Sequence, residues 1–328
     1  MNRSLLKRAV LSLSFPLLLT LPPSAEPLAQ TGHATKLQSL SAACREPVIR
    51  IFAVGHIYGD PRKWPNPRLA SSLLRALPQM RSAPPTFVMV LGDLLAHPSS
   101  GAYEALRTAF VEPLGVPVFN APGNHDLIDH RLYERHWGPT RYSFVCGNTG
   151  ILVVNSETAE SGLAEEIEHA TRFIEAVAGD ETLENLFVFS HKLIWAGPGS
   201  DLAIAGRKSN WWGTTPLFAA LLPALRAAGR TKRVFWGSGD LGSRRGFSTF
   251  MSRVRDDNVG YFAAGLGDLS SDALVEIVIR RGRAPEFHKR PLVPGLGARE
   301  DLEGVSTYYI RSVFERLRSA LDLSGAGK

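Results

Sequence analysis

Two patterns of apolar residues alternate along the chain from residue 47 onward. Short continuous apolar runs, rich in β-branched and aromatic residues, are typical of buried strands, and segments with apolar residues every three or four positions are typical of helices. In the first half, the pattern predicts helices over 68–80, 101–115 and 127–137. It predicts strands over 48–54, over 86–93, in the run 116–126 that enters a glycine turn, and in a hairpin spanning 142–157.

The second half continues the alternation. It predicts helices over 162–179, 216–230 and 301–323, and strands over 185–192, 232–240, 259–268 and 272–282. Helices that join strands of the same direction indicate a layered α/β protein whose sheet faces are covered. The hairpins indicate a mixed sheet or two packed sheets. No internal repeat or low-complexity linker divides the chain, so residues 47–328 are predicted to form one domain that ends in a C-terminal helix.

The first residues resemble an export signal. A positively charged start precedes the apolar run 9–21, and small residues follow, with Ala25 and Ala29 as possible cleavage points. The run is shorter than the roughly 20 apolar residues that span a bilayer. We therefore expect a signal peptide over 1–25, a flexible leader over 26–46 and an exported protein, periplasmic or secreted. An uncleaved N-terminal anchor stays open as the alternative, and no later segment is apolar enough to span.

Charge and cysteine content add two constraints. The formal net charge is +6, and removing the expected signal peptide lowers it to +3, because three basic residues and no acidic ones leave. So small an excess disfavours nucleic acid as a partner. Cys44 and Cys146 are the only cysteines. In an exported protein they either form a disulfide or stay as two thiols, and the sequence leaves both possibilities open.

Polar residues gather directly after the predicted strands. Open α/β sheets bind their ligands at the carboxyl ends of strands, and glycines beside such residues let the backbone turn closely around an ion or a phosphate. Each residue is a weak signal alone, but five strand ends carry one or more of them. The residues are His56, Asp60, Asp93, Asn124, His125, Asp126, His191, Ser238 and Asp240.

The order and spacing of these groups resemble those of the calcineurin-like metallophosphoesterases. That family's motifs run G-D-x-H-G, G-D, G-N-H-D/E, H and G-H-x-H. This chain reads "GHIYGD", "LGD", "APGNHD", "FVFSH" and "GSGD", and "WGPTRYSFVCGNTGILVVNSE" also resembles the stretch that follows G-N-H-D. The resemblance covers about residues 47–285. It implies a four-layer αββα sandwich of mixed sheets flanked by helices, with a pocket for two metal ions.

The resemblance also implies roles for the residues that match. Asp93 would bridge the two metals as part of the catalytic centre. Asn124 would bind the second metal and the substrate through its side chain, and His191 would bind the second metal as well. His125 would face the substrate and protonate the leaving oxygen. Two metals so placed clamp phosphate oxygens and activate a water for in-line attack.

Four of the seven expected protein ligands depart from the family pattern. His56 and Tyr58 stand where the first motif has Asp and His, and Ser238 and Asp240 stand where the last motif has two His. An exchange of His and Asp between positions 56 and 240 keeps one imidazole and one carboxylate for the first metal. Tyr58 would ligate as a phenolate on an acidic ion such as iron(III), because its ordinary pKa is near 10. Ser238 is a weak ligand and is expected to contact the substrate instead.

Two functions stay open at this point. In the first, the protein is an exported phosphomonoesterase or phosphodiesterase with one or two divalent or trivalent ions (Zn, Mn or Fe). Its substrate would be a small phosphoester or a phosphorylated envelope component. In the second, the fold is catalytically silent and binds a phosphorylated or saccharide ligand or an envelope partner. Trp211 and Trp212, in the segment 208–216, would either stack on such a ligand or pack as a cap on the sheet.

Overall fold

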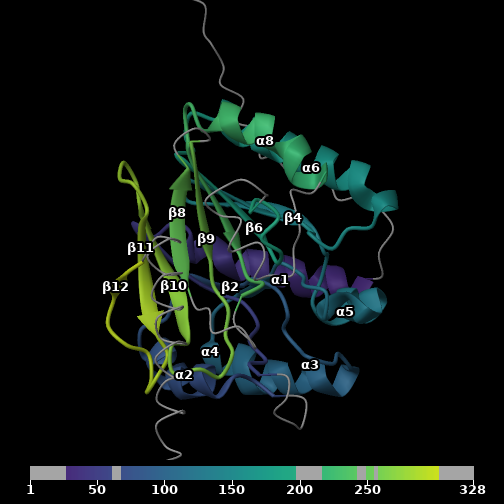
Figure 1. The fold of residues 1–328 in the computed structure, drawn as a ribbon, viewed down its shortest axis with the longest axis vertical. Helices are drawn as coiled ribbons and strands as arrows, with labels where there is room; N and C mark the ends of the chain where they lie inside the picture. Colours follow the sequence, from purple (N-terminus) through teal and green to yellow (C-terminus); the bar gives the residue numbers. More distant parts are fainter. Residues whose placement is uncertain (1–26, 61–67, 197–215, 242–248, 255–257, 303–328) are drawn as a thin grey trace, which may run out of the picture.

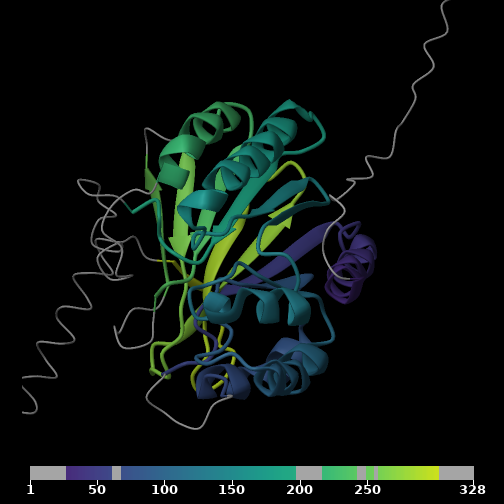
Figure 2. The same ribbon diagram turned by 90° about the vertical axis from the view of Figure 1, so that its right-hand side faces the viewer.

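Two sheets packed face to face make the centre of the molecule, and helices cover both outer faces (Figures 1 and 2). The structure is a computed structural model, and it describes residues 27–60, 68–196, 216–241, 249–254 and 258–302. The predicted helix over 301–323, apart from its first two residues, and the tryptophans Trp211 and Trp212 lie outside this part of the chain.

The first sheet has six strands and is mixed. Its strands β1, β2 and β3 run parallel, whereas β10, β11 and β12 continue the sheet from β1 with antiparallel pairs. The order across the sheet is β12 (Glu300–Asp301), β11 (Glu286–Pro291), β10 (Ala273–Arg280), β1 (Val48–Val54), β2 (Phe87–Val90) and β3 (Val118–Asn120).

The second sheet also has six strands. Four parallel strands form its middle, and an antiparallel strand closes each edge. The order is β4 (Tyr142–Cys146), β5 (Thr149–Val153), β6 (Asn185–Ser190), β7 (Arg233–Ser238), β9 (Val259–Ala263) and β8 (Phe250–Val254). The antiparallel pair β4–β5 confirms the hairpin predicted within 142–157.

The helices from residue 71 onward fall into two groups, one on each outer face (Figure 2). Helices α6 and α8 pack on the second sheet, and the others pack on the first sheet. The helix predicted over 101–115 is confirmed as a continuous run that includes one π-helical turn. The elements are α2 (Ser71–Ser82), α3 (Ser100–Leu106), the π turn Arg107–Val111, α4 (Glu112–Leu114), the 3-10 turn Asp126–Asp129, α5 (His130–His136), the 3-10 turn Glu160–Gly162, α6 (Leu163–Gly179) and α8 (Pro216–Ala228).

Strand alternation explains the layers. Successive side chains of a strand point to opposite faces, so each central strand serves two cores. On β1, Ile51 faces the core between the sheets, whereas Phe52 faces the helices. On β6, Phe187 faces the core between the sheets, and Val188 faces α6 and α8. Three apolar cores between four layers confirm the predicted αββα sandwich.

The segment 26–46 differs from the flexible leader that we expected, because it contains helix α1 (Pro27–Ala43). The side chains of Leu40 and Cys44 are buried in the core between the sheets. A disulfide joins Cys44 to Cys146 at the end of β4, with their Cα atoms 4.8 Å apart. This contact settles the open question about the cysteines and attaches α1 to the domain.

The remaining differences between the predicted and observed elements lie at the sheet edges. Strands β8, β11 and β12 were not predicted, and Asp301, the first residue of the predicted terminal helix, belongs to β12.

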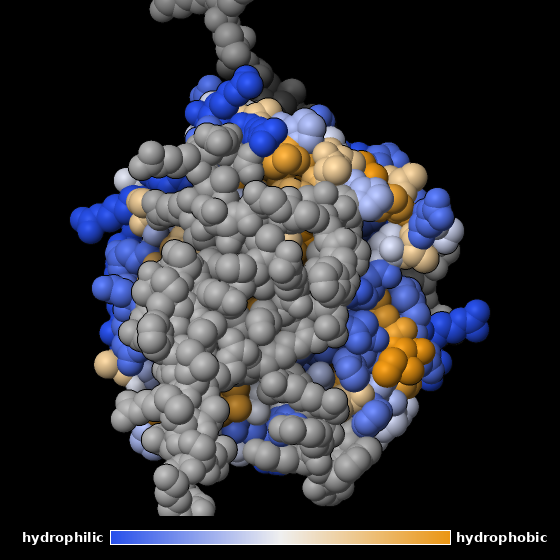
Figure 3. Space-filling view, in the orientation of Figure 1, coloured by the Kyte–Doolittle hydropathy of each residue, from blue (hydrophilic) through white to orange (hydrophobic). Residues whose placement is uncertain are grey.

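Among the described helices, none has the length and apolarity needed to cross a bilayer. The described surface visible in Figure 3 is mostly hydrophilic, with hydrophobic residues in separate groups.

Candidate metal centre

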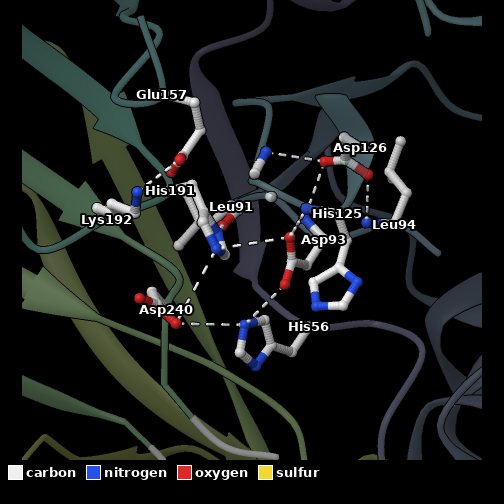
Figure 4. Close-up of polar contacts among 12 residues, drawn as sticks. His56, Leu91, Asp93, Leu94, His125, Asp126, Glu157, His191, Lys192 and Asp240 are labelled. Atoms are coloured by element: carbon white, nitrogen blue, oxygen red, sulfur yellow. Dashed lines mark hydrogen bonds and ion pairs between the residues drawn. The ribbon is translucent and has the colours of Figure 1, made fainter. Parts of the chain in front are cut away.

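Four titratable side chains meet at one point beside the carboxyl ends of strands from both sheets (Figure 4). His56 follows β1 and Asp93 follows β2, in the first sheet. His191 follows β6 and Asp240 follows β7, in the second sheet. The local fold produces this meeting because parallel strands of one sheet end at the same edge.

The four side chains form a closed ring in which imidazole nitrogens alternate with carboxylate oxygens. Nε2 of His56 lies 3.1 Å from Oδ2 of Asp93 and 3.5 Å from Oδ1 of Asp240. Nε2 of His191 lies 3.5 Å from Oδ1 of Asp93 and 4.0 Å from Oδ1 of Asp240. We call these four residues, His56, Asp93, His191 and Asp240, the ring.

The ring nitrogens suit a metal ion. Nδ1 of His191 lies 2.8 Å from the backbone oxygen of Leu91, which orients the imidazole and leaves Nε2 facing the two carboxylates. Nε2 of His191 and both ring nitrogens of His56 are buried with no assigned hydrogen-bond partner among the described residues, and the Nε2 contacts to the carboxylates lie at ion-pair distance. Buried polar atoms normally have partners. His56, His191 and Asp240 each offer an atom within 4.8 Å of the others, so the residues fit a cation.

Electrostatics favour positive charge inside the ring. Burial by itself lowers the pKa of both imidazoles, but the carboxylates of Asp240 and Asp93 outweigh it. They raise the pKa of His56 to about 9 and the pKa of His191 above its ordinary value. The Asp93 carboxyl shows the converse: burial raises its pKa, but His191 and His56 hold the pKa far below the ordinary value. The ring therefore attracts protons or a metal ion.

Asp126 is a buried carboxylate in the same region that sequence reasoning left without a role. Its oxygens accept hydrogen bonds from the backbone nitrogens of Asp93, Leu94 and Gly123 at 2.8–2.9 Å, and from the Asn120 side chain at 3.0 Å. These contacts tie the turn after β2 to the turn after β3. The only sequence signal for this role is the position of Asp126 at the end of "GNHD", because a carboxylate in a turn often accepts hydrogen bonds from backbone N–H groups.

The ring also depends on unusual backbone conformations. His56 and Asp93 have positive φ angles of 50° and 62°, which are uncommon for residues with a side chain. Such strain is often found at functional sites. Gly92, with φ of 86°, touches the ring closely, because a Cβ atom there would lie 2.3 Å from Nδ1 of His191.

Three predicted residues lie beside the ring. The Tyr58 hydroxyl donates to Oδ2 of Asp93 at 3.3 Å, and the Tyr58 ring stacks on His56. Burial raises the pKa of Tyr58 well above its ordinary value, and Asp93 adds to this rise. His125 is half-buried, and its backbone nitrogen donates to Oδ1 of Asp93 at 3.2 Å. Asn124 is exposed in the turn after β3.

Ser238 does not join the ring and does not face a substrate, in contrast to our prediction. Its side chain is fully buried toward the helices α6 and α8. Its hydroxyl donates to the backbone oxygen of Lys192 at 3.1 Å and lies 2.9 Å from both the Ser190 hydroxyl and the Trp195 indole nitrogen. The side chain shares its direction with Trp236, two residues earlier on β7, which belongs to the same helix-side core.

Comparison with known proteins places this site in a family. The chain matches the family model described as calcineurin-like phosphoesterase over residues 50–252. It therefore belongs to the calcineurin-like phosphoesterases, whose members are phosphoester hydrolases that use divalent metal ions. A search among proteins with curated functions found no match.

Solved structures resemble this chain at low sequence identity, and the lupin phosphatase, with a TM-score above 0.5, shares its fold. The purple acid phosphatase PPD1 from yellow lupin (Lupinus luteus) seeds is 12% identical, with a TM-score of 0.55 over 80% of this chain and 55% of that chain. PhoD is 9% identical, with a TM-score of 0.43 over 79% and 73% of the two chains. The phosphopantetheinyl hydrolase PptH from Mycobacterium tuberculosis is 11% identical, with a TM-score of 0.37 over 67% and 90%. This chain thus spans little more than half the length of the lupin phosphatase.

Proposed function

We propose that the protein is an exported, metal-dependent hydrolase of phosphomonoesters or phosphodiesters, with its altered metal site built from the ring. The observation that carries the proposal is the meeting of His56 and Asp240, the two positions that exchange His and Asp relative to the family motifs. Their ligand atoms lie 3.5 Å apart, so the exchange preserves a metal-binding pair. A site that had simply decayed would not be expected to keep both partners in contact.

The ring residues would hold the ion, and the residues around it would prepare the reaction. A bound divalent ion would polarise a phosphoryl oxygen and supply a reactive water at neutral pH. Asp240 is the least buried ring member, with a side chain 14% exposed, so the ring opens toward solvent on its side. The Tyr58 hydroxyl and the His125 backbone nitrogen hold the two oxygens of Asp93 in place.

His125 is the candidate general acid. Its Nδ1 lies 2.8 Å from the backbone oxygen of Ala96, which orients the imidazole. With a proton on Nδ1 donated to that carbonyl, Nε2 is left to hold the second proton and give it to the leaving oxygen of the substrate. The centroids of the His125 and Tyr58 rings lie 5.4 Å apart, and the Tyr58 hydroxyl contacts Asp93, so the imidazole lies close to the ring.

The proposed location and substrates follow from other features. The Cys44–Cys146 disulfide supports export, because disulfides persist mainly in oxidising compartments. We propose a small phosphoester or a phosphorylated envelope component as the substrate. The net positive charge is small, which disfavours nucleic acid as a partner.

Turnover assays with and without metal test the proposed activity. Purified protein is assayed with p-nitrophenyl phosphate and bis(p-nitrophenyl) phosphate after loading with Zn²⁺, Mn²⁺ or iron. We expect turnover of at least one ester, loss on chelation and recovery on reloading. Asp240→Asn is expected to lower kcat/KM at least about a hundredfold, because removal of a ligand weakens the charge stabilisation that the ion supplies.

Asp129→Asn is the matched control. Asp129 lies on the surface and caps α5 by accepting from the Leu132 backbone nitrogen at 2.9 Å, and asparagine caps helices equally well. This variant should keep full activity. Folded, metal-loaded protein that hydrolyses neither ester would contradict the enzyme proposal and favour the binding protein as the alternative.

A further inference from the structure

We propose that the ring binds a single metal ion through all four of its residues, instead of the two ions that the family motifs imply. This inference deepens the function proposed above and rests on the metal site assigned there. It changes the role of His191, which the resemblance gave to a second ion. In the structure, His191 shares its two carboxylate neighbours, Asp93 and Asp240, with His56.

The size of the ring matches the coordination shell of one ion. Zinc binds imidazole nitrogen and carboxylate oxygen at about 2.0–2.1 Å, so neighbouring ligand atoms of a tetrahedral site lie about 3.3 Å apart. The four nitrogen–oxygen edges of the ring measure 3.1, 3.5, 3.5 and 4.0 Å, and the two edges at Asp93 end on different oxygens, Oδ2 toward His56 and Oδ1 toward His191. Single ligand atoms of His56, His191 and Asp240 already lie within 4.8 Å of one another. A rotation of the Asp93 carboxylate that turns one oxygen toward both imidazoles, with small inward shifts of the other side chains, would complete a tetrahedral N₂O₂ shell.

The charge of the ring matches one divalent ion. Two carboxylates and two neutral imidazoles carry a net charge of −2, which a single divalent cation neutralises. Asp126, another buried carboxylate of this region, accepts four hydrogen bonds from Asp93, Leu94, Gly123 and Asn120. Its charge is therefore already stabilised by N–H donors that orient the turns.

With His191 in the ring, few of the described residues remain as ligands for a second ion. Ser238 is buried on the opposite side of β7 and donates to the backbone oxygen of Lys192. Asn124 is exposed. Asn124 and a shared Asp93 would be the remaining protein ligands for a second ion.

Metal stoichiometry tests this inference independently of turnover. The full chain is purified, stripped with a chelator, titrated with Zn²⁺ and analysed for bound metal after dialysis. We expect a plateau at one Zn²⁺ per chain. Titration with Co²⁺ should give the intense visible d–d absorption of a tetrahedral site, saturating at one equivalent. A plateau at two tightly bound ions would overturn the inference, as would metal-free protein.

Variants identify the ligands and provide the matched control. His56→Ala and His191→Ala should each weaken Zn²⁺ binding at least about a hundredfold, because even residues that only support ligands contribute 10–100-fold to metal affinity. His191 discriminates best, since in a two-ion site its loss would leave the first ion bound. Asn124→Ala should leave the stoichiometry and the Co²⁺ spectrum unchanged, whereas a two-ion site would lose its second ion in this variant.

The results separate this inference from the proposed function. One bound ion per chain without turnover of any phosphoester would support the inference and contradict the proposed activity. Two bound ions with turnover would retain the activity and contradict the inference. If the alanine variants fail to fold, His56→Gln and His191→Gln provide the same comparison with a smaller change in volume. Unchanged Zn²⁺ affinity in folded glutamine variants would also contradict the inference.

Discussion

Asp93 and Asp126 show how neighbouring carboxylates in one pocket take different tasks. Asp93 faces the ring, where His191 and His56 stabilise its charge. Asp126 faces backbone N–H groups. Burial and the nearby Asp93 raise the pKa of Asp126 to about 6, although its hydrogen bonds favour the ionised form. Asp126 thus shapes the turns that carry Asp93 and His125 rather than contacting an ion.

Asp126→Asn should destabilise the protein by about 2–4 kcal/mol, because the amide has one acceptor oxygen for four donors and presents its own NH₂ group to them. Denaturant unfolding followed by circular dichroism measures the change. Asp129→Asn, whose surface cap is preserved, should unfold like the wild type. Equal stability of the Asp126→Asn protein and the wild type would show that these bonds contribute little.

Gly92 provides a second prediction at this scale. Gly92→Ala places a Cβ atom 2.3 Å from Nδ1 of His191, and its φ of 86° adds backbone strain. We expect at least about tenfold weaker Zn²⁺ binding, since the bond that orients His191 would be displaced. Isothermal titration calorimetry gives the affinity.

Gly115→Ala is the control for backbone strain alone. Gly115 also has a positive φ, 68°, but an added Cβ there meets no atom within 4 Å. This variant should lose about 1 kcal/mol of stability and keep its metal affinity. If both alanine variants bound Zn²⁺ like the wild type, close packing of Gly92 against His191 would not matter for the site.

Strand ends were predictable from the sequence, whereas the direction of a side chain after the strand was not. Ser238 and Asp240 are two residues apart, a spacing that would put both on one face of a strand. However, β7 ends at Ser238, and the backbone nitrogens of Gly239 and Asp240 both donate to the His191 carbonyl. That turn directs Asp240 into the ring and leaves Ser238 among the helices. The sequence contains no local signal for this turn beyond Gly239.

At the scale of elements, the central strands were predicted and the marginal ones were missed. The central strands β1, β2 and β6 are mainly apolar and largely buried on both faces, which is the clearest strand signal. Strand β11 reads "EFHKRP" and is only half-buried, so its sequence resembles a loop. Helix α1 is rich in small and polar residues, and its position depends on distant contacts to β4 and α5 that local patterns do not reveal.

Strand β10 carries an ion-pair cluster that connects three strands of the first sheet and gives a pH prediction. Glu276 is fully buried, and its carboxylate pairs with Arg50 on β1, Arg290 on β11 and Arg299. Burial alone would raise the pKa of Glu276, but hydrogen bonds from Arg299 and Arg290 lower it from 4.5 to about 2. The ionised Glu276 carboxylate therefore contributes fully to the stability of the protein above about pH 4.5, and this contribution is lost as the pH falls through 2.

Urea unfolding between pH 6 and pH 2 measures this effect. The wild type should lose stability across the interval, and Glu276→Gln should lack that part of the pH dependence, because it has no proton to bind. Arg299→Gln removes one of three cations and should reduce the effect without abolishing it. Identical pH profiles for the wild type and Glu276→Gln would refute the assignment.

At the scale of the whole molecule, the disulfide joins the first described helix to the sandwich. Cys44 and Cys146 are 102 residues apart, so the bond constrains a long loop of the unfolded chain. The double variant Cys44→Ser/Cys146→Ser should be less stable by about 2–5 kcal/mol in denaturant unfolding under oxidising conditions. Addition of a reductant should bring the wild type to the level of the variant. A wild type that is equally stable with and without reductant would contradict this role of the bond.

The ring draws two side chains from each sheet, and this division has a consequence for how the molecule would acquire the proposed ion. His56 and Asp93 follow strands of one sheet, and His191 and Asp240 follow strands of the other, so neither half of the sandwich contains the site by itself. The chain would have to dock its sheets before all four residues could hold the proposed ion, so metal capture during refolding would report a late step of assembly. Once bound, the ion would add a cross-link to the apolar core that joins the two sheets.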